Sequence, residues 1–226
     1  TLKFLEVQGC PPEKITPVPL GIPLEDFPYQ ERTKLPAQLK MVQIATVTEK
    51  KGQLDSMEAL RLALNTCPNL HLTLAGEKQD KSLVEKIDNF IKTNRLQAHV
   101  TRLDAIPHEN LASFLGEFDV FIHPSHQTAQ HDCEGSPVVI LEAQSTGLPV
   151  IATTHADIPA QVLQGISGLL SAENDPVALR GSIERFYDMG AAEYGQFSRA
   201  ARKQVEQHFD VKLTGNILRA VYESAL

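Results

Sequence analysis

The feature that most constrains this chain is a regular alternation of short apolar segments with longer amphipathic ones after residue 40. Six short segments have the residues of buried strands: 41–46, 70–76, 98–103, 119–125, 148–153 and, more weakly, 167–170. Helices are expected at residues 53–64, 80–93, 108–115 and 137–145, and from Asp175 onward. This alternation predicts an α/β fold, a Rossmann-like parallel sheet with helices on both faces.

Residues 1–38 do not follow this pattern. Residues 1–9 are predicted to be the end of a helix closed by a glycine, which a left-handed cap favours. Residues 14–20 could form a short edge strand, because their prolines exclude a central one. Residues 21–38 hold three prolines and several charges and are predicted to be an extended linker. One Rossmann-like unit with C-terminal helices is then expected over residues 39–226.

The composition of the chain excludes some classes of binding partner and indicates a cellular location. The net charge of −7 argues against nucleic acid, because proteins that bind its phosphate backbone carry a basic stripe. No apolar run approaches the roughly 20 residues of a membrane-spanning helix, and no signal peptide is visible. Three well-separated cysteines suit a reducing compartment. We expect a cytoplasmic protein, with attachment at the inner membrane face left open. Because the first residue is Thr, we also expect a processed or partial chain.

One candidate site lies where the fourth strand leads into a helix, because parallel sheets bind ligands beyond the carboxyl ends of their strands. Ser136 is expected to cap that helix and Pro137 to take its first position. The free N–H groups of Gly135–Val139 would then form an anion site, which a glycine lets a ligand approach. Glu134 at the same mouth either accepts from sugar hydroxyls or is only an acidic residue at a helix start.

Glu142 stands inside the apolar run VVILEA, where a buried carboxylate without a partner would be costly. One interpretation is that it accepts hydrogen bonds from two ribose hydroxyls, as acidic residues do in dinucleotide-binding folds. The other is that it lies on a solvated helix face. The sequence by itself leaves both open.

A second candidate site follows the first strand, where Lys50, Lys51 and Gly52 precede a helix. A lysine at such a turn can hold a diphosphate as a point charge, although a pair of surface lysines has the same pattern. The chain has neither a Walker sequence nor G-x-G-x-x-G. The usual nucleoside-triphosphate and NAD sites are therefore not expected.

The loop after the fourth strand is dense in histidine, with Asp132 and Cys133 near His123, His126 and His131. Their spacing matches neither C-x-x-C nor H-E-x-x-H, so we expect polar ligand contacts there rather than a metal site. No Ser-His-Asp order can be argued, and G-x-S-x-G is absent.

Five segments, in order, resemble the retaining glycosyltransferases of the large family four, whose GT-B fold has two Rossmann-like domains. The E-x7-E motif is matched by EGSPVVILE, the GRLxxxKG segment by IATVTEKKG and the aDvfvlPS segment by FLGEFDVFIHPS. The stretch after the motif resembles EAQSTGLPVIATTHADIP, and the interdomain linker resembles GCPPEKITPVPLGIPLEDF. The resemblance is closest to bacterial capsule or exopolysaccharide enzymes. It implies that residues 1–38 are the linker and the end of an N-terminal acceptor domain, and residues 39–226 the nucleotide-sugar-binding domain.

The resemblance also implies a role for each matching residue. Glu134 would be the catalytic residue and contact the donor sugar, Glu142 would bind the ribose and Lys51 the diphosphate. The backbone amides of Gly135, Ser136 and Val138 would face the sugar and phosphate. The backbone near Ala105 and Ile106 would contact the base. The family uses no metal or other cofactor, and its retaining reaction is described as front-face attack assisted by the leaving phosphate.

Two positions depart from the family pattern. Thr46 stands where the family has an arginine that donates two hydrogen bonds to the diphosphate. Its absence would lower donor affinity about ten- to a hundredfold unless Lys50 substitutes. Ala160 replaces the usual glutamate of G-x-PE. Both departures weaken the transfer of roles from the family to this chain.

We therefore interpret the chain as the donor half of a retaining glycosyltransferase, which moves a sugar from a nucleotide-diphosphate sugar to a glycan or lipid-linked acceptor. The acceptor would be held by the N-terminal domain of such enzymes, so these residues alone are expected to bind donor without transferring it. The alternatives are a phosphorylase or epimerase of the same fold, and a non-catalytic binding module, which Thr46 supports.

Overall fold

The computed structural model describes residues 2–32 and 37–224 and confirms the α/β class. Its core is a six-stranded sheet in the order β3-β2-β1-β4-β5-β6, with every neighbouring pair parallel. The strands are β1 (Leu39–Ile44), β2 (Leu70–Ala75), β3 (Val100–Leu103), β4 (Val120–His123), β5 (Val150–Thr153) and β6 (Gly168–Ser171). All the carboxyl ends therefore lie along one edge of the sheet, where such folds bind ligands.

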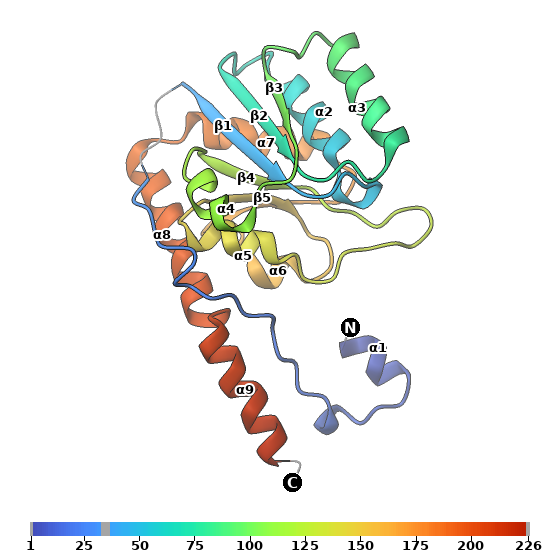
Figure 1. Ribbon diagram of the computed structural model, residues 1–226, viewed down its shortest axis with the longest axis vertical. Coiled ribbons are helices and arrows are strands. Elements are labelled where there is room, and N and C mark those ends of the chain that lie inside the picture. Colours follow the sequence, from blue (N-terminus) through green and yellow to red (C-terminus); the bar gives the residue numbers. More distant parts are fainter. Residues whose placement is uncertain (1, 33–36, 225–226) are drawn as a thin grey trace.

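Helices cover both faces of the sheet (Figure 1). One face packs against α2 (Gln53–Ala63), α3 (Lys81–Thr93) and α7 (Pro176–Asp188). The other packs against α4 (His108–Leu115), α5 (Val138–Ser145) and α6 (Ile158–Gln161). The remaining helices are α1 (Leu2–Val7), α8 (Ala191–His208), α9 (Val211–Ser224) and two short 3-10 turns, η1 (Pro12–Lys14) and η2 (Glu49–Lys51).

The strands are apolar on both faces because each face has its own core. In β1, Met41 packs into the core beneath α2 and α7, while the next residue, Val42, packs into the core beneath α4 and α5. Helix α8 closes one side of the sheet, with Tyr194 near its start in the first core and Val205 near its end in the second. Continuous apolar strands with two buried faces are typical of parallel sheets.

The N-terminal segment follows the prediction in part. Helix α1 ends as expected, since Gly9 has a φ of 88° and Cys10 N–H donates to the carbonyl of Leu5. The edge strand expected at residues 14–20 is wrong: Lys14 ends the turn η1, and residues 15–20 pair with no strand among the described residues. Prolines favour extended backbone with or without a sheet neighbour, so their pattern could not distinguish the two.

Residues 21–32 contain a turn at residues 24–26 and no helix or regular strand, and they are anchored to the domain. Ile22 forms a bridge with Asp210, and both Ile22 and Phe27 are fully buried in the core beneath α4 and α5. The buried guanidinium of Arg32 donates to the carbonyls of Leu115, Phe118 and Thr146, where α4 and α5 end. Residues 33–36 of the predicted linker lie outside the described residues.

Helix α9 and the N-terminal segment both extend beyond the body of the sheet (Figure 1). In the described part of the chain, no helix combines the length and the apolar character needed to cross a bilayer.

Candidate active site

The turn after β1 lies directly against the start of the β4–α5 loop, at the carboxyl edge of the sheet. The backbone N–H of His126 donates to the carbonyl oxygen of Lys50 at 3.0 Å. Gly52 has a φ of 65°, and a Cβ at this position would overlap the carbonyl of Pro124. A glycine is therefore required between Lys51 and α2, because it allows both the left-handed backbone and the close approach.

This packing brings the two predicted lysines to the two carboxylates of the loop. The Lys51 ammonium donates to Glu134 Oε2 at 2.8 Å, and the Lys50 ammonium donates to Asp132 Oδ1 at 3.0 Å. Lys50 Nζ also lies 4.0 Å from Glu134 Oε1. The hydrogen bond to Asp132 raises the pKa of Lys50. The lysines are therefore not an ordinary pair of surface charges, since they form one cluster with Glu134.

Glu134 is held by its backbone as well as by its side chain. Its side chain is only 10% exposed, and its other oxygen, Oε1, is buried and has no hydrogen-bond partner among the described residues. Its N–H donates to His155 Nε2 at 3.0 Å, and His155 Nδ1 lies 2.8 Å from Glu173 Oε1. His155 and Glu173 were not identified from the sequence. His155 follows a strand at the carboxyl edge, as Lys51 does, and that signal could have found it.

The start of α5 differs in detail from the prediction. Pro137 is the N-cap residue rather than the first helical residue, and no side chain in the described part of the chain caps the helix. Ser136 Oγ instead accepts a hydrogen bond from Gln161 Nε2 at 2.8 Å, because the buried Gln161 lies beside it on α6. The first N–H groups of α5, beginning with Val138, have no intrahelical acceptors and remain available to an anion.

Gly135 lies in open space at this mouth. A Cβ on Gly135 would meet no atom within 4 Å, so packing within the chain does not require a glycine there. A ligand that lay against the backbone of this loop would require one.

Glu142 lies further along α5, and its side chain is only 13% exposed. A solvated helix face is therefore the wrong interpretation of this residue. Its carboxylate lies 3.7 Å from His108 Nε2, and this histidine is itself 64% exposed. Burial raises the pKa of Glu142, and the neighbouring His108 opposes that shift. A buried carboxylate with such a weak partner is suited to accept hydrogen bonds from a ligand.

Two further predicted positions lie at the same edge of the sheet. Thr46 follows β1, and its carbonyl accepts from Gln53 Nε2 at 3.0 Å. Ile106 precedes α4 and is partly buried against the core beneath that helix. Because Glu142 approaches the first residue of α4, Ile106 and Glu142 belong to the same end of the site.

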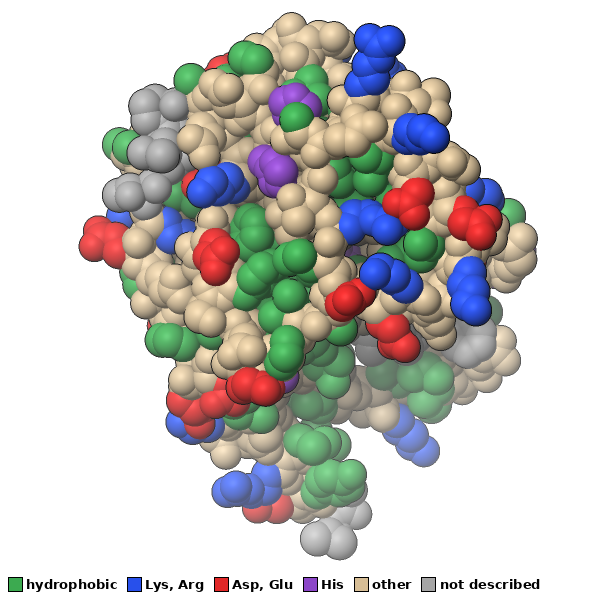
Figure 2. Space-filling view, turned by 45° about the horizontal axis from the view of Figure 1, so that its top comes forward, with side chains coloured by type: hydrophobic (Ala, Val, Ile, Leu, Met, Phe, Trp, Pro, Cys, Tyr) green, Lys and Arg blue, Asp and Glu red, His purple; other side chains and the backbone are tan. Residues whose placement is uncertain are grey.

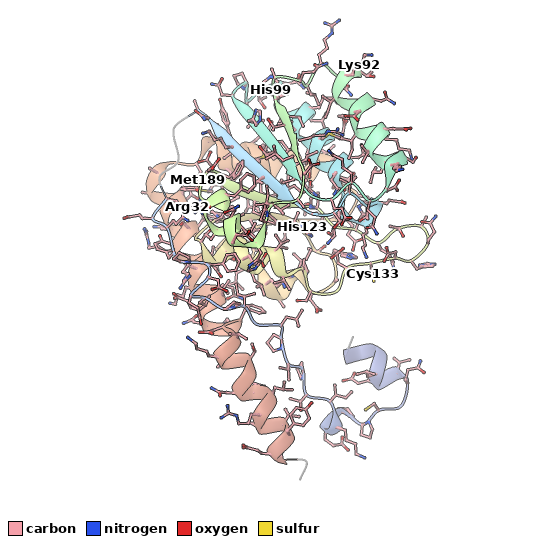
Figure 3. The ribbon with its side chains drawn as sticks, in the orientation of Figure 1. Arg32, Lys92, His99, His123, Cys133 and Met189 are labelled. Carbon is pink, nitrogen blue, oxygen red and sulfur yellow. The ribbon has the colours of Figure 1, made fainter. Side chains whose placement is uncertain are left out.

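The polar side chains of the histidine-rich loop contact residues outside it. His126 Nδ1 lies 3.2 Å from Asp55 Oδ2, and Asp132 pairs with Lys50. His123 lies in the interior at the end of β4, whereas Cys133 lies on the projecting β4–α5 loop (Figure 3). Burial, reinforced by Lys51 and His155, lowers the pKa of His123 to about 3, so this imidazole is neutral. Among the described residues, no group of three or more His, Cys, Asp or Glu side chains is placed to hold a metal.

Comparison with known proteins identifies the class to which this fold and site belong. The sequence profile of the family Glycosyl transferases group 1 matches residues 29–204, and the chain belongs to that family. Among named relatives, it is 32% identical over 219 residues to the amylovoran biosynthesis glycosyltransferase AmsK of Erwinia amylovora, covering 97% of this chain and 53% of AmsK. It is 30% identical over 225 residues to the putative colanic acid biosynthesis glycosyltransferase WcaL of Escherichia coli, with the same coverages.

A solved structure shows the same fold. Anabaena HepE in complex with UDP and glucose superposes with a TM-score of 0.82 at 17% identity, over 99% of this chain and 60% of HepE. The chain spans about half the length of the curated relatives it matches.

Proposed function

We propose that this chain binds a nucleotide-diphosphate sugar, and that the protein transfers the sugar, with retention of configuration, to a glycan or lipid-linked acceptor. The observation that carries the proposal is the Lys51–Glu134 pair, which lies before the uncapped N-terminus of α5. A cation and free helix N–H groups suit a diphosphate, and a carboxylate beside them suits sugar hydroxyls. The names of AmsK and WcaL support a role in exopolysaccharide synthesis.

The remaining contacts follow from the positions along the carboxyl edge. Lys51 and the amides of Gly135, Ser136 and Val138 hold the diphosphate. Glu142 accepts from the ribose hydroxyls, and the backbone around Ala105 and Ile106 lies against the base. Lys50 is the second cation of the cluster, and it supplies positive charge that Thr46 does not.

Catalysis on this proposal rests on stabilising the leaving diphosphate. As the bond between sugar and phosphate breaks, negative charge grows on the phosphate oxygens. On this proposal Lys51 and the helix N–H groups face that charge, and donors fixed in place before the reaction lower its barrier. Glu134 orients the sugar, so that the acceptor oxygen and the leaving phosphate share one face. The acceptor proton passes to a phosphate oxygen, so no separate base from this chain is required.

The test is a thermal-shift and calorimetric screen of UDP, GDP and ADP, each with and without an attached sugar. A ligand at a hundred times its Kd stabilises the native state by about 2.7 kcal/mol, which is about 5–10 °C for a chain of this size. Lys51→Met should abolish most of the shift. Lys212→Met is the matched control. Lys212 lies on helix α9, away from the site, and forms an exposed ion pair with Glu25.

The screen also separates the rival functions. No shift with any nucleotide at millimolar concentration would refute the donor site and favour a binding module. Consumption of inorganic phosphate in place of an acceptor would indicate a phosphorylase, and interconversion of the free nucleotide sugar would indicate an epimerase.

A further inference from the structure

Glu173 bridges the two ends of the loop that carries Glu134. Its Oε2 accepts from the backbone N–H of Gln127 at 2.8 Å, near the start of the loop. Its Oε1 lies 2.8 Å from His155 Nδ1, and the other ring nitrogen of His155 reaches Glu134 at the end of the loop. One carboxylate in the segment after β6 thus fixes both ends of the loop.

The direction of these hydrogen bonds is determined by their chemistry. A backbone N–H can only donate, so His155 Nε2 accepts from Glu134 and carries no proton. The proton of the neutral ring then lies on Nδ1, which donates to Glu173 Oε1. A carboxylate that accepts from Nδ1–H fixes both the tautomer and the ring plane, as it does in other oriented histidines. His155 is 4% exposed, so water does not compete for these bonds.

Glu173 itself has the charge that this arrangement needs. Burial raises its pKa, but the bonds from Gln127 N–H and His155 outweigh burial, and the pKa of Glu173 is lowered. His126, on the loop itself, also faces Glu173, and its charge when protonated lowers the pKa of Glu173 further. Because its side chain is 32% exposed, Glu173 belongs to neither core. Its two side-chain hydrogen bonds go to the N–H of Gln127 on the loop and to His155, which in turn binds Glu134.

These contacts hold Glu134 through atoms that Lys51 does not bind. Lys51 binds the carboxylate, while His155 binds the backbone N–H of the same residue. The next residue, Gly135, accepts through its carbonyl from Asp157 N–H, two residues after His155. The orientation of the Glu134 side chain therefore depends on the place where His155 holds its backbone.

We propose that Glu173 and His155 are positioning residues for Glu134, and that they set its carboxylate against the sugar of the bound donor. The proposal rests on the proposed function, because it takes Glu134 to be the residue that recognises the sugar. It goes beyond that function by assigning a role to two residues outside the E-x7-E segment. Neither residue needs to touch the donor.

The experiment measures affinities for a nucleoside diphosphate and for its sugar conjugate, using whichever of UDP, GDP or ADP stabilises the wild-type chain most. Glu173→Gln keeps the size of the side chain, but its NH2 group must face either the N–H of Gln127 or the Nδ1–H of His155, and neither can accept a hydrogen bond. We expect the affinity for the nucleotide sugar to fall about tenfold, the loss of one charge-assisted hydrogen bond. The affinity for the free diphosphate should not fall, because Lys51 and α5 are untouched and a displaced Glu134 competes less with the diphosphate for Lys51.

A double-mutant cycle then tests the connection to Glu134. If Glu173 acts through Glu134, Glu173→Gln should cause no further loss of nucleotide-sugar affinity in a Glu134→Gln background. His155→Asn should behave like Glu173→Gln, because asparagine keeps a donor near Nδ1 but has no acceptor at the place of Nε2. The His155→Asn variant also provides the test if Glu173→Gln does not fold.

The matched control is Glu184→Gln. Glu184 on α7 also accepts two side-chain bonds, from Thr66 and Arg180, but it lies away from the loop. This variant should leave both affinities unchanged. Equal losses for diphosphate and nucleotide sugar, additive losses in the double mutant, or no loss at all would each overturn the positioning role. A wild-type chain that binds no nucleotide would instead overturn the proposed function, so the two failures are distinguishable.

Discussion

Glu142→Gln should raise the stability of the unliganded protein and lower its affinity for the nucleotide. The carboxylate is 13% exposed, and its nearest described partner is His108 at 3.7 Å. Its pKa is raised by burial, so the folded state disfavours the ionised form. The cost is present above the folded-state pKa and disappears as the pH falls toward the unfolded value. After allowance for solvent screening, a neutral amide should stabilise the chain by about 0.5–1 kcal/mol at neutral pH, or about 1–4 °C.

The same change removes a charged acceptor for two ribose hydroxyls. Hydrogen bonds to charged groups contribute about 1.5–3 kcal/mol, so the affinity for the nucleoside diphosphate should fall about ten- to a hundredfold. Calorimetry of the diphosphate and melting of the free protein measure the two effects separately. Glu109→Gln, on the exposed side of α4, is the control. An affinity within about twofold of wild type would show that Glu142 does not bind the nucleotide.

Three further predictions concern the turn after β1 and the loop that packs on it. Thr46→Arg should tighten diphosphate binding at low salt, with a gain that fades as salt rises; unchanged affinity by calorimetry at low salt would mean that the turn faces elsewhere. Gly52→Ala should destabilise the chain by about 1–3 kcal/mol, measured by urea unfolding, because its left-handed backbone and the overlap with Pro124 both oppose a Cβ. The Asp55 carboxylate, 3.2 Å from His126 Nδ1, raises the pKa of His126, so the stability from this pair is complete below the unfolded pKa of about 6.5 and is lost as the pH rises through the folded-state pKa. The melting difference between wild type and His126→Gln should therefore shrink from about pH 6 to about pH 9, and a constant difference would refute the pairing.

The fold was predictable because its signal is repeated along the chain. Every strand between residues 39 and 171 is anticipated by an apolar run, and the helix expected at residues 53–64 is observed as α2. Helix α6 was missed, because four residues are too few to show a helical period. Whether residues 14–20 pair with a strand depends on a distant neighbour, which no local pattern contains.

The site was predictable to the level of its edge. Carboxyl ends of parallel strands meet along one edge, so Lys51 and Glu134 were expected at the same edge of the sheet. Their direct contact depends on β1 and β4 being adjacent strands. The pairing of Ser136 with Gln161 instead of the helix N–H groups was not predictable, because it depends on the place where α6 packs. The Glu173 bridge joins loops that follow adjacent strands, and only the strand order makes those loops neighbours.

Positive and negative side chains in this protein are interspersed on the face drawn in Figure 2, and the site follows the same pattern. Its lysines are already neutralised, Lys51 by Glu134 and Lys50 by Asp132. A diphosphate must therefore compete with Glu134 and Asp132 for the two lysines. As a phosphate takes Lys51, Glu134 loses its cation and both of its oxygens need new donors. The hydroxyls of an attached sugar supply those donors, whereas a free diphosphate leaves the carboxylate poorly paired in a partly buried position. Recognition of phosphate and recognition of sugar are thus linked through one carboxylate, and the intact donor should bind more tightly than its own leaving group.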